Sequence, residues 1–592
     1  MKPERVLRLL AVTAAVLFIL VLMTLVVSAL SSPGAGLAVL VVAALAYLAW
    51  RALGKWVRRG TILEVDLENG VVEKPPSSPL ERTLRRGAVV LRDVTDALDR
   101  AAEDERISGV VVRLGNGGIG LGQAQELREA VARFRAAGKS ATAYAETFGE
   151  SGRATVDYYL AAAFDEIHLQ PMGSLSIEGM VARTPFLRSL FDRFGVTPDF
   201  DHRREYKAAK YLLTETEYVE PHREATTGIL EDQMRQIVEG IAEDRDLDPE
   251  RVRELIDGAP LLDQEALSSG LVDRLSFRDQ AYHAAGAEGR FLYHDKYLKR
   301  AGRPHRKGER IALVYGTGAI ARGSSRFDPL TGGTTLGADD VAQALRGAAD
   351  DEKVKAIVFR VDSPGGSAVA SEVVRREVVR AREAGKAVVV SMGDVAGSGG
   401  YWISAPADRI VAQPGTITAS IGVVAGKLAA ADAWSRVGID WGELHEGRNA
   451  TFSVALQPYT DSERARLEAL LDAIYQEFKE RVGEGRSMSP EAVEEVAKGR
   501  VWTGAQAMER GLVDDLGGMH RALEAARELA GIPSDASLQL KIFPAKRPIP
   551  LPERKQGSDP VSVLTDSVLS LARAVREVSE GPSVELRVSE PR

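Results

Sequence analysis

From about residue 60 onward, short apolar runs alternate with longer stretches of mixed apolar and charged positions. Ile107 to Leu114 and Val354 to Val361 are short and rich in β-branched residues, which is typical of buried strands. Leu127 to Phe134 has the apolar spacing of a helix, and Arg375 to Glu383 is a charged stretch between two apolar runs. This alternation predicts α/β architecture, with helices connecting the strands.

A further apolar run, Ala387 to Val390, predicts another buried strand. The glycine-rich segment Gly393 to Gly400 then predicts a turn, and Tyr401 to Ala405 predicts the start of a helix. Ser398 lies in this strand-to-helix turn, where a nucleophile is open to substrate and the helix N-terminus offers free N–H groups to an oxyanion. A tight Gly/Ser turn without chemistry has the same pattern, so this segment alone does not decide between the two.

The N-terminus is patterned differently. Leu9 to Leu30 is an uncharged apolar run that exceeds the roughly 7–15 residues of a signal-peptide core and reaches the roughly 20 needed to cross a bilayer, so it predicts an anchor. Leu37 to Trp50 is shorter and fits a short span, a re-entrant segment or an interfacial helix. Basic residues flank both runs. Two spans therefore predict a hairpin with both ends in the cytoplasm, whereas a single span places most of the chain outside it.

Composition excludes several kinds of chemistry. The chain has 592 residues, more than one domain needs, and a net charge of −8 without a large basic block, so nucleic acid is not an expected partner. It has no cysteine, which excludes disulfides, zinc–thiolate sites and cysteine nucleophiles.

Sequence landmarks recur in the same order along the chain, which indicates a duplication with small insertions and deletions. The paired landmarks are Arg113 with Arg360, Gly138 with Gly385, Asp165 with Asp408, and Gly270 with Gly511. We expect a membrane anchor over residues 1–59, a first repeat over 60–305, a second repeat over 306–543, and a linker and tail over 544–592. In the tail, 544–552 predicts an extended linker, 561–578 an amphipathic helix and 584–588 a short strand.

The two copies differ at the candidate nucleophile. By the repeat alignment Ser398 corresponds to Thr155, so only the second copy has a nucleophile between glycines. A serine nucleophile needs a base, and the nearest histidine in sequence is His445. A distant histidine or a desolvated lysine can serve, and composition does not choose among them.

The second copy resembles the signal peptide peptidases of the protease IV type, in their long, two-repeat form. The motifs that carry the resemblance are Asp362-Ser-Pro-Gly-Gly366, Ser391 to Trp402, Gly415 to Gly422, and Gly499 to Gly504 with Gly511 to Asp514. The resemblance implies tandem Clp protease/crotonase-like repeats (a ββα superhelix) and a Ser-Lys dyad. Ser398 matches the nucleophile of the family, Lys207 in Glu205-Tyr-Lys-Ala-Ala matches its lysine, and Ser420 matches the serine that orients the lysine.

The repeat provides an internal check on this assignment. Lys207 of the first copy corresponds to Ala450 of the second, so each copy has lost the group that the other retains. This complementary loss predicts one shared site, in which the first repeat donates the lysine and the second the serine. Lys210 is the nearest competing base, and Lys427 is a weaker one.

We expect the backbone N–H groups of Gly365 and Gly399 to hold the oxyanion. The expected function is a membrane-anchored serine endopeptidase that degrades cleaved signal peptides without metal or cofactor. The resemblance further implies a homo-oligomer, a tetramer, in the bacterial inner membrane, with its catalytic domain outside the cytoplasm. Two alternatives stay open: a crotonase-like acyl-CoA enzyme, since that fold also uses Gly-Gly oxyanion loops, and a non-catalytic membrane scaffold.

Overall fold

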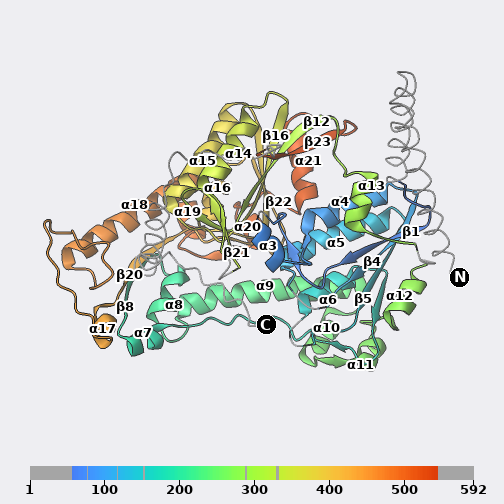
Figure 1. Ribbon diagram of the computed structural model, residues 1–592, viewed down its shortest axis with the longest axis horizontal. Helices are drawn as coiled ribbons and strands as arrows, with labels where there is room; N and C mark the ends of the chain where they lie inside the picture. Colours follow the sequence, from blue (N-terminus) through green and yellow to red (C-terminus); the bar gives the residue numbers. More distant parts are fainter. Residues whose placement is uncertain are drawn as a thin grey trace, which may run out of the picture.

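The computed structural model describes residues 56–544, except residues 77, 116–117, 151, 153, 287–289 and 329–331 (Figure 1). Within these ranges no helix is both long and apolar enough to cross a membrane. The predicted anchor (9–30 and 37–50) and the elements predicted for the tail lie outside the described residues.

The first repeat is built on a parallel six-stranded sheet in the order β10-β6-β5-β4-β1-β11. Its central strands are apolar and buried on both faces, as expected for a parallel sheet covered by helices. The strand bounds are β1 Thr61–Asp66, β4 Ile107–Arg113, β5 Ser140–Ala145, β6 Glu166–Leu169, β10 Arg274–Leu275 and β11 Phe291–Tyr293.

The second repeat reproduces this topology. Its parallel strands run β22-β18-β17-β16-β12-β23, so each strand of the first sheet has a counterpart at the same place in the order. The bounds are β12 Glu309–Thr317, β16 Val354–Ser363, β17 Ala387–Gly397, β18 Arg409–Ala412, β22 Asp515–Leu516 and β23 Leu538–Phe543. The duplication predicted from the landmarks is therefore also visible in the strand order.

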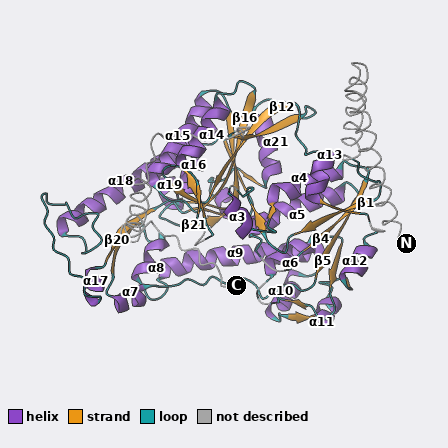
Figure 2. Ribbon diagram, viewed as in Figure 1, coloured by secondary structure: helices purple, strands orange, loops and turns teal. Residues whose placement is uncertain are grey.

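The helices follow the same correspondence, and they cover both sheets in Figure 2. The predicted helical stretches are confirmed, within α5 of the first repeat and α15 of the second. The paired helices are α4 (Leu91–Ala102) with α14 (Ala338–Ala349), α5 (Leu121–Ala136) with α15 (Ala368–Glu383), α6 (Thr155–Ala162) with α16 (Gly399–Ser404), and α9 (Glu220–Arg245) with α18 (Asp461–Arg486).

Polar contacts are duplicated as well. The Tyr158 hydroxyl donates to the Leu271 carbonyl at 2.7 Å in the first repeat, and Tyr401 donates to the Leu512 carbonyl at 2.9 Å in the second. Both tyrosines are completely buried, so each hydroxyl requires its partner. These matched bonds hold α6 and α16 in equivalent places.

Helix α9 joins the two repeats. It runs along the lower side of the molecule in Figure 1 and contacts both α6 and β21 (Val501–Thr503). On this helix, Gln233 Nε2 donates to the Gly415 carbonyl at 2.8 Å, and Asp232 accepts from Thr503 Oγ1 at 2.6 Å. The first repeat is thereby held against β21 and the start of β19, and β19 in turn pairs with β17.

One local prediction was wrong. The segment from Gly393 to Gly397 was expected to be a turn, but β17 continues through it and pairs with β19 (Ile417–Ala419). The small side chains explain the difference, because Gly393 has Asp362 within 3.1 Å of where a Cβ would stand and needs glycine for packing rather than for turning. The reversal is confined to Ser398, where α16 begins.

Candidate active site

Ser398 lies in the abrupt turn between β17 and α16. Its φ of 53° and ψ of −118° form a backbone conformation that residues with a Cβ rarely adopt. Two bonds fix the turn: the Ser398 N–H donates to the Ala419 carbonyl at 2.7 Å, and the Ser398 carbonyl accepts from Trp402 N–H at 2.9 Å. This geometry directs the hydroxyl away from the strand, at the N-terminus of a helix.

Lys207 reaches Ser398 from the other repeat. It follows β8 (Thr197–Arg203), which forms an antiparallel ribbon with β20 (Val423–Ala429) of the second repeat. Strand β20 begins three residues after Ser420, so its pairing with β8 brings the first repeat close to the end of β19. Lys207 itself is only 6% exposed.

The three predicted side chains meet. Lys207 Nζ lies 3.0 Å from Ser398 Oγ, 2.9 Å from Ser420 Oγ and 3.1 Å from the Ser420 carbonyl oxygen. Ser420 also has a positive φ, 54°, and its N–H donates to the Arg500 carbonyl at 2.9 Å. The structure therefore places a buried amine within hydrogen-bond distance of two serine hydroxyls, one directly after β17 and one directly after β19.

A glycine makes room for the lysine. Gly499 has φ +81°, and a Cβ at this position would stand 2.5 Å from the Lys207 nitrogen and 2.7 Å from its Cα. Next to it, the Lys498 carbonyl accepts from the Tyr206 N–H at 3.1 Å. The backbone of the second repeat thus lies directly against the backbone that carries Lys207.

The two competing lysines are engaged elsewhere. Lys210 Nζ faces Asp201 at 3.8 Å. Lys427 lies over the Tyr459 ring at 4.2 Å and has the Thr451 carbonyl as an acceptor at 3.3 Å. Burial lowers the pKa of Lys427, although Glu463 opposes this effect. Neither amine contacts Ser398.

The N–H of Gly365, one of the two predicted oxyanion donors, already has a hydrogen-bond partner. The N–H of Gly365, predicted as an oxyanion donor, donates to Ser363 Oγ at 3.2 Å. Within the described residues, the N–H groups of Gly366 and Gly399 have no acceptor. The Gly366 nitrogen lies 3.2 Å from where a Cβ of residue 399 would stand, so these two free donors are close neighbours. The available pair is therefore Gly399 with Gly366 rather than with Gly365.

Among the described residues, the first repeat has no equivalent pair of serine and lysine. Ala154 caps α6 as Ser398 caps α16, so the structural counterpart of the serine is an alanine, one residue before the Thr155 of the sequence alignment. The Thr155 hydroxyl is buried and donates to the Gly179 carbonyl at 3.0 Å. Ala450, the counterpart of Lys207, lies outside any helix or strand.

Sequence reasoning missed a polar clamp beside the lysine. Glu224 of α9 accepts from the Tyr206 hydroxyl at 2.8 Å and from Arg500 at 2.7 Å. The Arg500 guanidinium also lies 4.8 Å from the centre of the Tyr206 ring. The hydrogen bond to Glu224 raises the pKa of Tyr206. The only sequence signal for this clamp is that Tyr206 and Arg500 adjoin Lys207 and Gly499.

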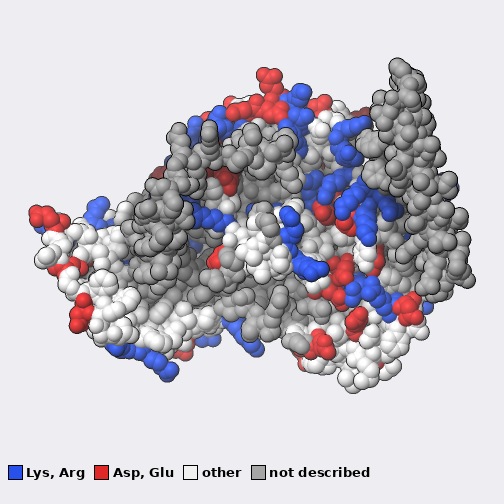
Figure 3. All heavy atoms as spheres, in the orientation of Figure 1, with Lys and Arg blue, Asp and Glu red and all other residues white. Residues whose placement is uncertain are grey.

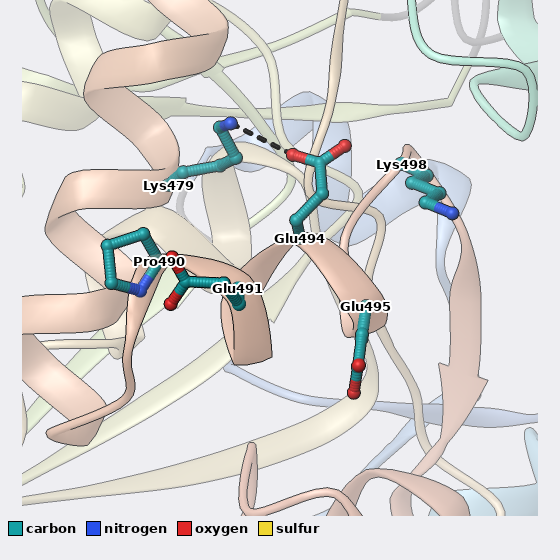
Figure 4. Close-up of a pocket in the computed structure, with 6 residues that line it drawn as sticks. All are labelled: Lys479, Pro490, Glu491, Glu494, Glu495 and Lys498. Carbon is teal, nitrogen blue, oxygen red and sulfur yellow. Dashed lines mark hydrogen bonds and ion pairs between the residues drawn. The ribbon is translucent and has the colours of Figure 1, made fainter.

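A surface depression is lined in part by Lys498, the neighbour of Gly499 (Figure 4). Charged residues dominate its lining: Lys479 donates to Glu494 at 2.8 Å, and the Lys498 side chain points away from Glu494. The lining residues are Lys479, Pro490, Glu491, Glu494, Glu495 and Lys498. None of these side chains contacts Ser398 or Lys207, so the depression is not the candidate site.

Comparison with known proteins assigns the chain to a family. The model of "Peptidase family S49" matches residues 133–290 and 380–533, one match in each repeat. The chain belongs to peptidase family S49. Protease 4 of Salmonella typhi is 32% identical to this S49 chain over 503 residues, covering 80% of the chain and 78% of the relative. Serine protease SPPA, chloroplastic, of Arabidopsis thaliana is 28% identical over 82% of the chain and 71% of the relative.

A third relative of the S49 chain, Protease 4 of Haemophilus influenzae, is 31% identical over 76% of the chain and 74% of the relative. Among solved structures, a ClpP1 N165D mutant from Listeria monocytogenes matches 36% of the S49 chain, with 14% identity and a TM-score of 0.22.

Proposed function

We propose that this S49 peptidase is a serine endopeptidase in which Ser398 is the nucleophile, Lys207 the general base and Ser420 the residue that orients the lysine. The observation that carries the proposal is the 3.0 Å separation between Lys207 Nζ and Ser398 Oγ, bridging two repeats that each lack the other group. The names of the relatives, Protease 4 and Serine protease SPPA, support the same reaction class.

The hydrogen-bond geometry is compatible with the neutral lysine that the mechanism requires. A neutral amine has two N–H donors and one lone pair, and the two donors are accounted for by the Ser420 carbonyl and hydroxyl oxygens. The lone pair is then left for the Ser398 hydroxyl, which donates to it. Burial also supports this state, because desolvation disfavours the charged form of an amine.

The reaction follows from these positions. Lys207 takes the proton of Ser398 Oγ while the oxygen attacks a peptide carbonyl, and the N–H groups of Gly399 and Gly366 hold the oxyanion. The lysine then gives its proton to the leaving amine as the C–N bond breaks. Water, deprotonated by Lys207, hydrolyses the acyl-enzyme and releases Ser398. No step requires a metal or an organic cofactor.

The finer assignments belong to the same proposal. The apolar N-terminal segment supports a membrane anchor, and cleaved signal peptides are substrates that such an anchored peptidase would meet. The resemblance to protease IV further supports Clp protease/crotonase-like repeats, a homo-oligomer, and a bacterial inner-membrane location with the catalytic part outside the cytoplasm.

Peptide cleavage by the purified full chain tests the proposal. We expect hydrolysis of an apolar, signal-peptide-like fluorogenic substrate, and a loss of about 1,000-fold or more in kcat/KM for Ser398→Ala. Ser391→Ala, a buried serine on the same strand that contacts Arg360, serves as the control for a change in β17. Undiminished cleavage by Ser398→Ala would contradict the proposal, as would acyl-CoA turnover in place of peptide cleavage.

A further inference from the structure

Exposed basic side chains gather where the described chain begins. In Figure 3, Lys and Arg cover the region of α4 and α13 (His294–Ala301). We define the basic face as the exposed residues Arg58, Arg59, Lys296, Lys299, Arg306 and Lys307. This local concentration contrasts with the net charge of −8 for the whole chain.

The first described residues are fixed to this face. Val57 is 2% exposed and belongs to the core of the first repeat. Arg300 of α13 donates to the Trp56 carbonyl at 3.3 Å, and Thr61 Oγ1 donates to the Arg58 carbonyl at 2.7 Å. The Trp56 side chain remains 58% exposed. The chain therefore leaves the folded part at a defined point of the basic face.

The predicted apolar segment ends close by. Five residues lie between Trp50 and Trp56, and the six residue steps that join them span at most about 20 Å. Whatever the number of spans, an anchor ending at Trp50 keeps the point of exit within that distance of the bilayer surface. An exposed tryptophan at this point suits the interfacial region, where aromatic side chains are enriched.

Acidic residues only partly neutralise the face. Asp295 pairs with Lys299 at 2.7 Å, and Glu105 faces Arg59 at 3.8 Å with both side chains more than 80% exposed (87% and 84%). Glu309 is also exposed nearby. Exposed pairs of this kind contribute little in water, so they leave the cations free to exchange partners.

From this placement we propose that the basic face binds the anionic headgroups of the lipid bilayer beside the anchor. Charge complementarity supplies the attraction, which acts over a Debye length of about 8 Å at physiological salt. Binding would fix the orientation of the peptidase relative to the membrane. The inference rests on the anchor of the proposed function but not on the Ser-Lys chemistry.

Lysine acylation of the full chain in lipid nanodiscs tests the inference. Phosphatidylcholine discs are compared with discs that also contain phosphatidylglycerol, and modified peptides are quantified by mass spectrometry. We expect Lys296, Lys299 and Lys307 to react about five-fold more slowly in anionic discs, and this protection to disappear in about 0.5 M salt. Lys498, which lines the surface depression, should react equally in both kinds of disc.

Two triple variants with the same net charge separate the effect of charge on the basic face from the effect of the charge of the whole chain. Arg58→Gln with Arg59→Gln and Arg306→Gln should abolish the protection while leaving all reporter lysines in place. The control removes the same charge from exposed arginines elsewhere, through Arg251→Gln, Arg253→Gln and Arg466→Gln, and should keep the protection.

The other outcomes are equally decisive. Equal lysine reactivity in both kinds of disc would overturn the inference while leaving the anchor and the peptidase intact. Protection by added heparin but not by anionic discs would assign the face to a soluble polyanion and overturn the lipid assignment. A chain that is retained by neither kind of disc would overturn the anchor together with this inference, and peptide cleavage would still test the chemistry separately.

Discussion

At the scale of single residues, the site depends on unusual backbone conformations. Ser398, Ala419 and Ser420 all have positive φ angles, 53°, 64° and 54°. Conformations of this kind cost about 1–3 kcal/mol each and persist only where the surroundings impose them. Here the β17–β19 pairing and the bond from Ser398 N–H to the Ala419 carbonyl impose them. The strain places both hydroxyls on the Lys207 amine.

Gly499→Ala adds one carbon atom where the backbone of the second repeat lies against the backbone of Lys207, and so tests this contact. The new Cβ would stand 2.5–2.7 Å from the Lys207 backbone, so the lysine must move away from Ser398. We expect kcat to fall by at least about ten-fold, since small misplacements of catalytic groups have large effects on rate. Gly511→Ala is the matched control: its φ is +71°, but nothing lies within 4 Å of the added Cβ. Equal activities of the two variants would contradict this account.

Ser420→Ala tests the orientation of the lysine. The variant keeps the carbonyl acceptor but removes the hydroxyl 2.9 Å from Lys207 Nζ. We expect kcat to fall about 10- to 100-fold with KM within about three-fold, because the hydroxyl does not contact substrate in the proposed mechanism. Steady-state kinetics on the peptide substrate measure both constants. A rise in KM with unchanged kcat would assign Ser420 to substrate binding instead.

At the scale of elements, the ribbon of β8 with β20 and the clamp beside it set the position of Lys207. The pattern of apolar runs predicted β4, β16 and the start of β17, because burial on both faces leaves a clear signal in sequence. The ribbon was not predicted: β8 is polar and its partner comes from the other repeat. The extension of β17 through Gly393 to Gly397 was also missed. In sequence, glycines required for close packing cannot be told from glycines required for a turn.

Glu224→Gln tests the clamp. The substitution removes the charge that Arg500 contacts at 2.7 Å while keeping a side chain that can accept from Tyr206. We expect kcat to fall about three- to ten-fold with little change in KM, through looser positioning of Lys207. Glu239→Gln, which breaks an exposed pair with Arg235 on the same helix, should leave both constants unchanged. Equal kinetics of the two variants would show that the clamp has no positioning role.

At the scale of the whole molecule, the repeats share a buried polar joint. Arg360 is 1% exposed and contacts Glu73 and Glu126 of the first repeat, each at 2.9 Å. Asp394 of the second repeat accepts from the Gln123 N–H at 3.0 Å, at the start of α5. The duplication was predicted from sequence because both copies retain landmarks, whereas the proposed division of the dyad between them came from the family resemblance. This joint was not predicted, since Arg360 appeared only as a landmark of the repeat.

The joint gives stability a pH dependence. Burial, together with Asp362 and Glu73, raises the pKa of Asp394 from 3.8 to about 7. A raised pKa means that the folded state holds the proton more tightly than the unfolded state. The resulting stabilisation is complete below pH 4 and is lost as the pH rises to about 7.

Asp394→Asn removes this titration and keeps an oxygen for the Gln123 N–H. Relative to the variant, the native chain should lose up to about 1 kcal/mol of unfolding free energy per pH unit between pH 4 and pH 7. Denaturant unfolding at several pH values measures the difference. Parallel pH profiles for the two proteins would contradict the role of Asp394.

The proposed site takes its base from one repeat and its nucleophile from the other. The most direct measurement is the rate at which a fluorophosphonate probe labels Ser398 in the native chain, Lys207→Ala and Lys210→Ala, with the labelled residue identified by mass spectrometry. We predict labelling of Ser398 in the native chain and at a similar rate in Lys210→Ala, and a loss of at least about 100-fold in Lys207→Ala. Labelling of Lys207→Ala at the native rate, or labelling at a residue other than Ser398, would contradict the claim.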